Sequence, residues 1–465
     1  MLRIIAPQQV SCISTSSILE CEKGEPSVST SKDYWRFHLL RRLPFSVYQW
    51  LFGIVFIGNM IPFVWILYRF ATLRELGLDC VLTAAATNFF ALVAVRNEHL
   101  VNLFYGLANV VARNSPPFTR HTFLSMIHHY GGIHSGCAVA GILWYCLFLT
   151  ATTCNFQNRQ PVDTAIIGIT WIVWLLLISM LVFAHPTLRA RLHDQFEVVH
   201  RFAGWTVIGL FWTQTMLVIA TFAKAEKLSF GSRLVRTQSF WLLVLITALL
   251  VYPWLRLRKR SVRIERISSH VVRFHFDYAT AEPCMAVKLS HAPLRENHAF
   301  ACIPAPDRGS GYSVLVSNAG DWTGNIIRNP PEKLWVREIP MRGVLWNATM
   351  FSRVVIVATG SGIGPCLGLF NGCPDLDCRI IWSTKSPEKT YGQGIIGSVL
   401  RADPSSIIVD TEKSGRPDLH KMAYTLYETT QSEAVFVISN QKLTKAVVGG
   451  LRGQGVSAYG PIWDS

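Results

Sequence analysis

Six long apolar stretches in the first 260 residues constrain this chain more than any other feature. A helix needs roughly 20 apolar residues to cross the hydrocarbon core of a bilayer, which is about 30 Å thick. Tryptophans and tyrosines gather near the ends of these stretches, as they do in the aromatic belts of membrane proteins. The sequence therefore predicts a multi-pass α-helical membrane bundle of six helices. They lie near residues 47–68, 78–95 running on toward 111, 134–153, 164–184, 202–222 and 239–257.

The charge of the chain agrees with a membrane protein. Half of the residues are apolar, 16% are charged, and the formal net charge is +15. Such a basic excess is typical of proteins that bind nucleic acids, acidic membrane surfaces or anionic ligands. Because the apolar stretches reach spanning length, we expect the lipid bilayer as a partner and no nucleic acid.

Basic residues also predict the orientation of the bundle, because short positively charged loops stay on the cytosolic side. They cluster at residues 32–42, before the first stretch, and at residues 256–263, after the sixth. Both termini are therefore expected to be cytosolic. The basic loop at residues 224–236 runs against this rule. Residues 1–45 lack the features of a signal peptide and are expected to form a disordered cytosolic tail.

After the sixth stretch the pattern changes to that of a soluble module. Val272, Phe274 and Phe276 alternate with polar residues, as in a half-buried strand. Further strands are expected at residues 285–289 and 312–316. Short apolar runs beyond residue 353 are typical of parallel strands buried on both faces. We thus expect a transmembrane domain at 46–257, an antiparallel β-barrel at 258–350 and an α/β domain at 351–465.

A glycine-rich turn marks the expected dinucleotide site. The strand at residues 354–358 leads into Thr359-Gly360-Ser361-Gly362-Ile363-Gly364-Pro365, with Pro365 suited to the first position of a helix. Glycines let backbone amides approach a pyrophosphate, and a helix N-terminus attracts anions. Gly360, Ser361, Gly362, Gly364 and Pro365 are therefore candidates for binding NAD(P)H.

Other strand ends of an open α/β sheet line the same crevice. The segments at residues 382–385, 410–411 and 439–440 are therefore candidates for contacts to ribose, adenine or nicotinamide. Lys385 would favour a 2′-phosphate, although the choice between NADH and NADPH stays open.

A second motif lies earlier in the module. His298-Ala299-Phe300-Ala301 is followed by Gly320-Asp321-Trp322-Thr323. This order resembles the ferredoxin-reductase-type module of ferric reductases and NADPH oxidases, in which a His-Pro-Phe-Thr/Ser motif faces the flavin and a Gly-Asp-Trp-Thr element lies near the diphosphate. The resemblance implies FAD as a cofactor. By this resemblance, the residues that bind it are His298, Phe300, Asp321, Trp322 and Thr323.

The match departs from the family at two positions, because Ala299 and Ala301 replace the proline and the hydroxyl residue. The resemblance covers roughly residues 120–465. It is strongest to a fungal group of ferric-reductase-like integral membrane flavoproteins associated with redox homeostasis, development and secondary metabolism, in some of which a comparable unit is fused to an adenylate-forming domain. It also places Trp463 near the nicotinamide.

The same resemblance raises the question of haem. The family holds two haems between its third and fifth helices, each through one histidine from each helix. Here His129 and His200 match the inner pair, so one b-type haem is an open expectation. The outer positions fall near residues 142–143 and 213–214, which hold no histidine. We expect no outer haem.

These observations predict a membrane-bound oxidoreductase that passes electrons from cytosolic NAD(P)H through FAD to an unidentified acceptor. Two alternatives stay open from the sequence. One is a reductase for a hydrophobic biosynthetic intermediate that enters from the lipid. The other is a degenerate reductase that acts as a membrane redox sensor or scaffold, which Ala301 and the missing outer histidines favour.

Overall fold

The computed structural model describes residues 46–73, 77–113, 115–155, 161–305 and 309–461. It divides into two compact units. The helical bundle contains residues 46–104 and 125–256, and the sheet unit contains residues 105–124 together with the chain from Leu257 onward. The boundary differs from the predicted one, because residues 105–124 group with the sheet unit. The expected N-terminal tail and Trp463 lie outside the described residues.

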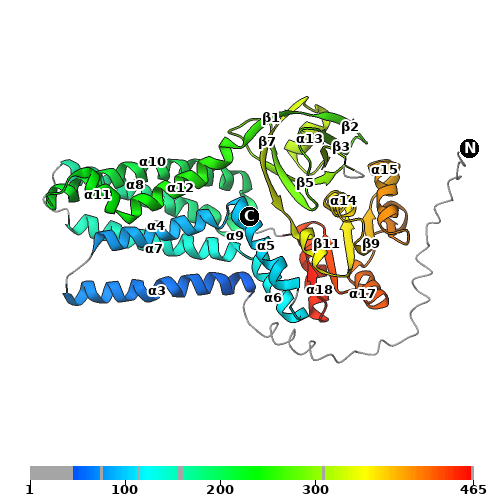
Figure 1. The fold of residues 1–465 in the computed structure, drawn as a ribbon, viewed down its shortest axis with the longest axis horizontal. Helices are drawn as coiled ribbons and strands as arrows, with labels where there is room; N and C mark the ends of the chain where they lie inside the picture. The colour runs from blue at the N-terminus through cyan, green and yellow to red at the C-terminus, as the bar shows by residue number, and fades with distance from the viewer. Residues whose placement is uncertain (1–45, 74–76, 114, 156–160, 306–308, 462–465) are drawn as a thin grey trace, which may run out of the picture. The chain divides into compact units, whose positions relative to one another are not determined.

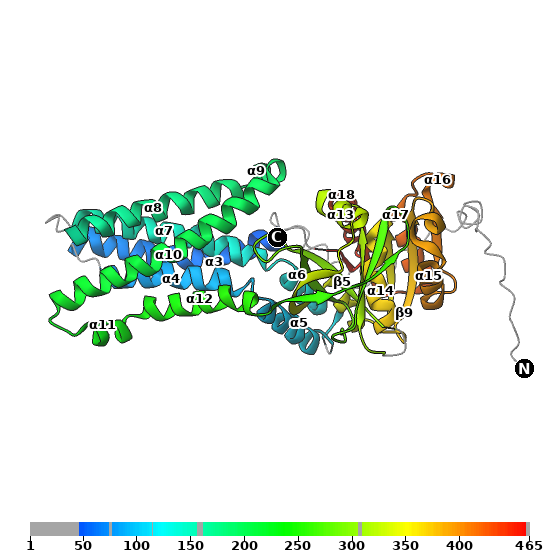
Figure 2. The same ribbon diagram turned by 90° about the horizontal axis from the view of Figure 1, so that it is seen from above.

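The bundle consists of long apolar helices. Five of them are long and apolar enough to cross a membrane, and a bent pair makes up to six. Figure 2 shows α8, α10 and α12 running lengthwise beside one another. The helices up to the first strand are α3 Val47–Leu73, α4 Leu78–Ala94, α5 Glu98–Arg113, α6 Pro117–His128, α7 Gly131–Asn155, α8 Pro161–Ala184, α9 Pro186–Arg191, α10 His193–Ala225, α11 Phe230–Arg236 and α12 Gln238–Leu255.

The predicted second span is not one straight helix. Helix α4 ends at Ala94, α5 begins at Glu98, and the two are bent by 71°. The break has a local cause, because the side chain of Asn97 accepts a hydrogen bond from the backbone N–H of His99 at 3.0 Å. A polar cap of this kind begins a new helix rather than continuing the old one.

Helix α3 packs on α7 through two glycines one helical turn apart. A Cβ at Gly132 would collide with the carbonyl oxygen of Tyr48, and one at Gly136 would lie 3.0 Å from Val55. Small residues at this spacing let helix backbones approach closely. The close approach is confined to the start of α7. Further along, Trp144 stands between the helices, with its ring 5.0 Å from that of Phe63.

The sheet unit begins with a curled seven-stranded antiparallel sheet, whose strand order is β1-β7-β4-β5-β6-β3-β2. The predicted alternation is present, because Val272, Phe274 and Phe276 are buried in its core. Helix α13, Asp321–Arg328, lies beside it. The strands are β1 Leu257–Ser261, β2 Arg263–Arg266, β3 Val271–Phe276, β4 Met285–Ser290, β5 His298–Pro304, β6 Tyr312–Ser317 and β7 Lys333–Arg342.

A five-stranded parallel sheet follows, in the order β10-β9-β8-β11-β12. Figure 1 shows α14 between this sheet and the curled one. Strand β8 is central and fully buried except at its ends, as expected for a parallel strand covered on both faces. The elements are β8 Arg353–Thr359, α14 Ile363–Gly372, β9 Asp377–Thr384, α15 Pro387–Ala402, β10 Ile407–Asp410, α16 Thr411–Ser414, α17 Leu419–Thr430, β11 Ala434–Ile438, α18 Gln441–Gly453 and β12 Ala458–Tyr459.

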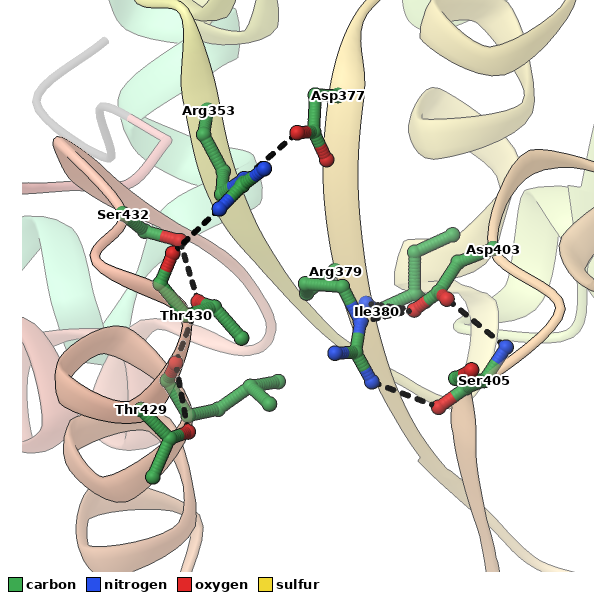
Figure 3. Close-up of polar contacts among 10 residues, drawn as sticks. Arg353, Asp377, Arg379, Ile380, Asp403, Ser405, Thr429, Thr430 and Ser432 are labelled. Carbon is green, nitrogen blue, oxygen red and sulfur yellow. Dashed lines mark hydrogen bonds and ion pairs between the residues drawn. The ribbon is translucent and has the colours of Figure 1, made fainter.

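Ion pairs fasten the amino-terminal edge of this sheet (Figure 3). Arg353 at the start of β8 donates to Asp377 at 2.6 Å, and Arg379 in β9 donates to Asp403 at 3.1 Å. Asp403 is buried and also accepts from the backbone N–H of Ile380. These pairs lie at the edge opposite the carboxyl-terminal edge, where ligands of α/β sheets bind.

Candidate functional site

The glycine-rich turn lies at the carboxyl end of the central strand, between β8 and α14. Gly360 has φ of +49°, in the left-handed region that favours glycine. A Cβ at Gly362 would collide with the carbonyl oxygen of Ile438, at the end of β11. The indole N–H of Trp382 donates to the carbonyl oxygen of Gly360 at 3.1 Å. The turn is therefore held in one conformation by both neighbouring strands.

The predicted site residues of this turn lie at the N-terminus of α14. Ser361 is exposed, and Gly364 and Pro365 are the second and third residues of the helix. Pro365 was predicted at the first position, and a short 3₁₀ turn before the helix accounts for the difference. Proline is tolerated anywhere in the first turn because the N–H groups there have no intrahelical partner. The arrangement fits a pyrophosphate, because backbone donors and the positive helix end face the exposed turn.

The candidate residues at the other strand ends have local structural roles as well. Trp382 is fully buried, so its indole is not available to a ligand. Asn440 caps α18, and Asp410 accepts from the backbone N–H groups of Ser386 and Glu412 at 2.9 and 3.0 Å. Lys385 lies on the surface with its ammonium 3.4 Å from the carboxylate of Glu412.

Glu412 is a functional candidate that the sequence did not single out. Its carboxylate accepts from the Ser386 hydroxyl and pairs with Lys385. These two contacts lower the pKa of Glu412 below the ordinary value for glutamate. A charged carboxylate therefore stands beside the lysine that was predicted to favour a 2′-phosphate, and it competes with a phosphate for that cation.

The flavin-motif residues meet in one aromatic cluster on the curled sheet. The Trp322 ring lies 4.3 Å from that of His298 and stacks on that of Phe300 at 5.8 Å. The His291 ring approaches Trp322 edge-on at 5.5 Å. The order of motifs along the sequence thus becomes a contact in space. His291 was not predicted, and only its position seven residues before His298 hinted at a role.

Buried polar atoms beside this cluster fit a bound ligand. Among the described residues, Nε1 of Trp322, Nε2 of His291 and Oδ1 of Asn297 are buried and lack a hydrogen-bond partner. Buried groups of this kind are costly unless something pairs with them. A flat heteroaromatic ring with donors and acceptors on its edge, such as the isoalloxazine of FAD, would satisfy them.

Asp321 and Thr323, which the resemblance places near the FAD diphosphate, differ in their local contacts. Asp321 is exposed in the first turn of α13. The Thr323 hydroxyl oxygen accepts from the backbone N–H groups of Ala319 and Gly320 at 2.9 and 3.0 Å. Two amides that would suit a phosphate are therefore already paired within the chain, and Thr323 has a capping role there.

Three glycines on α14 bring the two motifs together. The sequence analysis named Gly364 only as a candidate for binding NAD(P)H, and it missed Gly368 and Gly372. Gly364, Gly368 and Gly372 follow at four-residue intervals and face the curled sheet. A Cβ at Gly368 would lie 2.6 Å from the carbonyl oxygen of Cys302 in β5, and one at Gly372 would lie 2.5 Å from Pro283. The four-residue spacing was the available signal, since it places side chains on one face of a helix.

The predicted haem ligands lie at different kinds of position in the bundle. His129 is in the turn between α6 and α7, with Nδ1 2.6 Å from the carbonyl oxygen of Ser125. His200 is eight residues into α10, and its buried Nδ1 has no hydrogen-bond partner. His134, which was not predicted as a ligand, places its Nδ1 2.9 Å from the carbonyl oxygen of Leu92.

A hydrogen-bonded cluster lies near residues 142–143 and 213–214, the positions that correspond to the outer haem ligands of the family. Gln214 accepts from the Tyr145 hydroxyl at 2.9 Å and donates to Thr170 Oγ1 at 2.5 Å. The Gln214 side chain is almost fully buried, and Phe211 packs against Tyr145 at 5.5 Å. Buried polar groups that are satisfied in this way stabilise a unique packing of helices.

Relatives of the chain are known. A family model described as "Adenylate-forming reductase 03009, C-terminal domain" matches residues 344–465. Adenylate-forming reductases 03009 and 06235 of Coprinopsis cinerea are 40% and 39% identical to the chain over 427 residues. These matches cover 92% of this chain and 41% of each relative, so the chain spans about two fifths of their length. A flavohemoglobin from Malassezia yamatoensis shares 14% identity at a TM-score of 0.39, covering 83% of this chain and 100% of that chain.

These relatives correct the family that the sequence suggested. The resemblance pointed to a ferric-reductase-like group, whereas the curated relatives and the family model are those of adenylate-forming reductases. The motif residues alone therefore did not identify the family.

Proposed function

We propose that this chain is a flavin- and NAD(P)H-dependent oxidoreductase module attached to a membrane-spanning bundle. One observation carries the proposal: α14 begins directly after the turn at Gly360–Gly362, the proposed dinucleotide site, and its glycine face packs against β5, the strand of His298 and Phe300. The names of the curated relatives, which are reductases, support the reductive half of the proposal.

The residues divide the work between two ligands. Gly360, Gly362 and the first amides of α14 would hold the pyrophosphate of NAD(P)H, while His298, Phe300 and Trp322 would hold the flavin ring. When bound, FAD would accept two electrons as a hydride and pass them on one at a time. The contribution of the chain is to orient both ligands and to keep water away from them.

Tyr391 is suited to that positioning role. Its buried hydroxyl lies beside Thr384 of β9 and Ser317 of β6, and a Cβ at Gly360 would lie 3.7 Å from it. Burial raises the pKa of Tyr391, so the phenol stays protonated at physiological pH and can donate a hydrogen bond. It would link the curled sheet to the nucleotide turn.

The membrane location and the orientation are also part of the proposal. Five or six apolar helices support spanning, and the basic residues at 256–263 support a cytosolic sheet unit. The basic loop that opposed this orientation carries less free charge than its sequence suggests. Arg233 is buried and paired with Asp79 and Glu226, so its charge is neutralised locally.

A single b-type haem near His200 remains a subordinate proposal. The unpaired Nδ1 of His200 supports it, as does the His134 imidazole, whose Nδ1 contact with Leu92 leaves Nε2 for a ligand. His134 therefore competes with the predicted His129 as the partner of His200.

An absorption spectrum of the detergent-purified full chain tests the proposal. We expect flavin bands that bleach on anaerobic addition of NADPH or NADH. A Soret band that shifts on reduction would support the haem as well. Absence of flavin with retained dinucleotide binding would favour the sensor or scaffold alternative, and absence of both would overturn the oxidoreductase.

A matched pair of variants tests the nucleotide turn. Ser361→Glu places a carboxylate at the exposed turn, so the KM for NAD(P)H should rise about tenfold or more through repulsion of the pyrophosphate, with bound flavin retained. Ser405→Glu adds the same charge on the exposed surface before β10, at the opposite edge of the sheet, and should leave KM unchanged. Equal effects of both variants would count against the turn as the site.

A further inference from the structure

The helical bundle contains a cavity of about 570 Å³ that the redox proposal does not use. It is lined by residues of α3, α4, α7, α11 and α12, all within the bundle. Helices α3 and α4 both pack on α7, and Trp144 of α7 lies between them as part of the lining. The volume is in the range of pockets that bind drug-sized molecules.

The inner end of the cavity is polar. Asn59 Oδ1 accepts from Asn88 Nδ2 at 2.7 Å and from the Trp144 indole N–H at 3.1 Å. Asn88 Nδ2 also donates to the carbonyl oxygen of Ala84, whereas Asn88 Oδ1 receives no donor from the residues that the structure describes. An oxygen acceptor is therefore available to a ligand that carries a hydroxyl or N–H group.

Two arginines of α11 lie at the mouth of the cavity, where their charges balance those of Asp79 and Glu226. Arg233 is neutralised by Asp79 and Glu226. Arg236 is exposed in the cavity lining and has no ion pair among the described residues. Asp79 and Asn88 are nine residues apart on α4, so mouth and inner end are separated by roughly 14 Å. Between them, Pro62, Ile66 and Ala84 supply apolar surface.

We propose that this cavity binds an elongated aromatic or aliphatic carboxylic acid that carries a hydroxyl group at its far end. The carboxylate pairs with Arg236, the apolar body lies against α3 and α4, and the hydroxyl donates to Asn88. The site is independent of the proposed redox site, so its test does not require flavin or NAD(P)H.

Cys80 provides a direct measurement, because it is exposed and lines the cavity. The full chain in detergent is treated with a maleimide, with and without 12-hydroxydodecanoic acid, and labelling is followed by peptide mass spectrometry. We expect the acid to slow labelling of Cys80 severalfold and to leave Cys154, an exposed thiol outside the cavity lining, unaffected. Equal labelling of Cys80 with and without the acid would overturn the proposal.

Three further experiments test which chemical groups of the ligand the cavity recognises. The methyl ester of the probe should protect Cys80 less well, because it lacks the charge. Arg236→Gln should weaken protection about three- to fivefold, as expected for one exposed ion pair, while Arg191→Gln, which changes an exposed arginine of α9, should not. Protection by phosphatidic acid vesicles but not by the hydroxy acid would overturn the small-molecule site in favour of a lipid headgroup.

Discussion

The Nδ1 atom of His121 lies 3.1 Å from the hydroxyl oxygen of Tyr459, in a buried contact between α6 and β12. The Tyr459 ring stacks on Phe436 at 5.2 Å, and the guanidinium of the neighbouring Arg120 lies over Phe351 at 5.2 Å. Residues 105–124 therefore group with the sheet unit through specific side chains, although they lie between two apolar helices in the sequence.

Tyr459→Phe should lower the stability of the sheet unit by about 1–2 kcal/mol, because it removes one partner of a buried hydrogen bond and keeps the ring stacking. Thermal unfolding of the detergent-solubilised chain, followed by the fluorescence of a thiol-reactive dye, would measure this. Tyr68→Phe, at an exposed position of α3, is the control and should leave the unfolding temperature unchanged.

Gly368→Ala should destabilise the chain by about 1–3 kcal/mol, since the new Cβ would lie 2.6 Å from a backbone oxygen that cannot move aside. Gly394→Ala is the matched control, because no atom lies within 4 Å of its Cβ in α15. The control should be neutral or stabilising by about 0.5–1 kcal/mol, as for glycine replaced within a helix. Equal unfolding temperatures for both variants would contradict the close packing of α14.

Glu412→Gln should shift the nicotinamide preference toward NADPH by about threefold to fivefold, because the carboxylate no longer competes for Lys385. The ratio of KM values for NADH and NADPH measures this. Lys385→Gln should shift it in the opposite direction. Since the pKa of Glu412 is lowered, its carboxylate stays charged, and we expect the wild-type ratio to be constant from about pH 7 to 8, above the pKa of about 6 at which a phosphate monoester loses its second proton. A ratio that is insensitive to both variants would place the 2′-phosphate elsewhere.

His275 should contribute to a loss of stability in acid. Burial lowers the pKa of His275, and the charges of Arg263 and Arg273 lower it further. The carboxylate of Glu265, 2.7 Å from Nε2 of His275, raises the pKa but does not outweigh these effects. The unfolded state therefore binds the proton more readily, and stability falls as the pH drops below about 6.5 toward the folded pKa. His275→Gln should flatten the dependence of unfolding temperature on pH between about 7 and 5.5. An unchanged slope would mean that other groups dominate this range.

The elements of the sheet unit were largely predictable from the sequence, because their signals are local. Alternation around Phe274 marks a strand, and a glycine-rich string after residues 354–358 marks a turn at a strand end. Such patterns depend on the burial of one or two faces, which is the same wherever the element packs.

What the sequence determined by itself, then, was the kind and order of the elements and the chemistry of two motifs. Only the tertiary structure decided which side chains meet: Trp322 with His298 and Phe300, Glu412 with Lys385, and Gln214 with Tyr145. It also decided the cavity beside Trp144. These features depend on how elements that are far apart in the chain pack against one another. The distances between such elements are set by the volumes of the side chains at each contact, for example by the glycines of α14, which have no Cβ. No local pattern in the sequence encodes these distances.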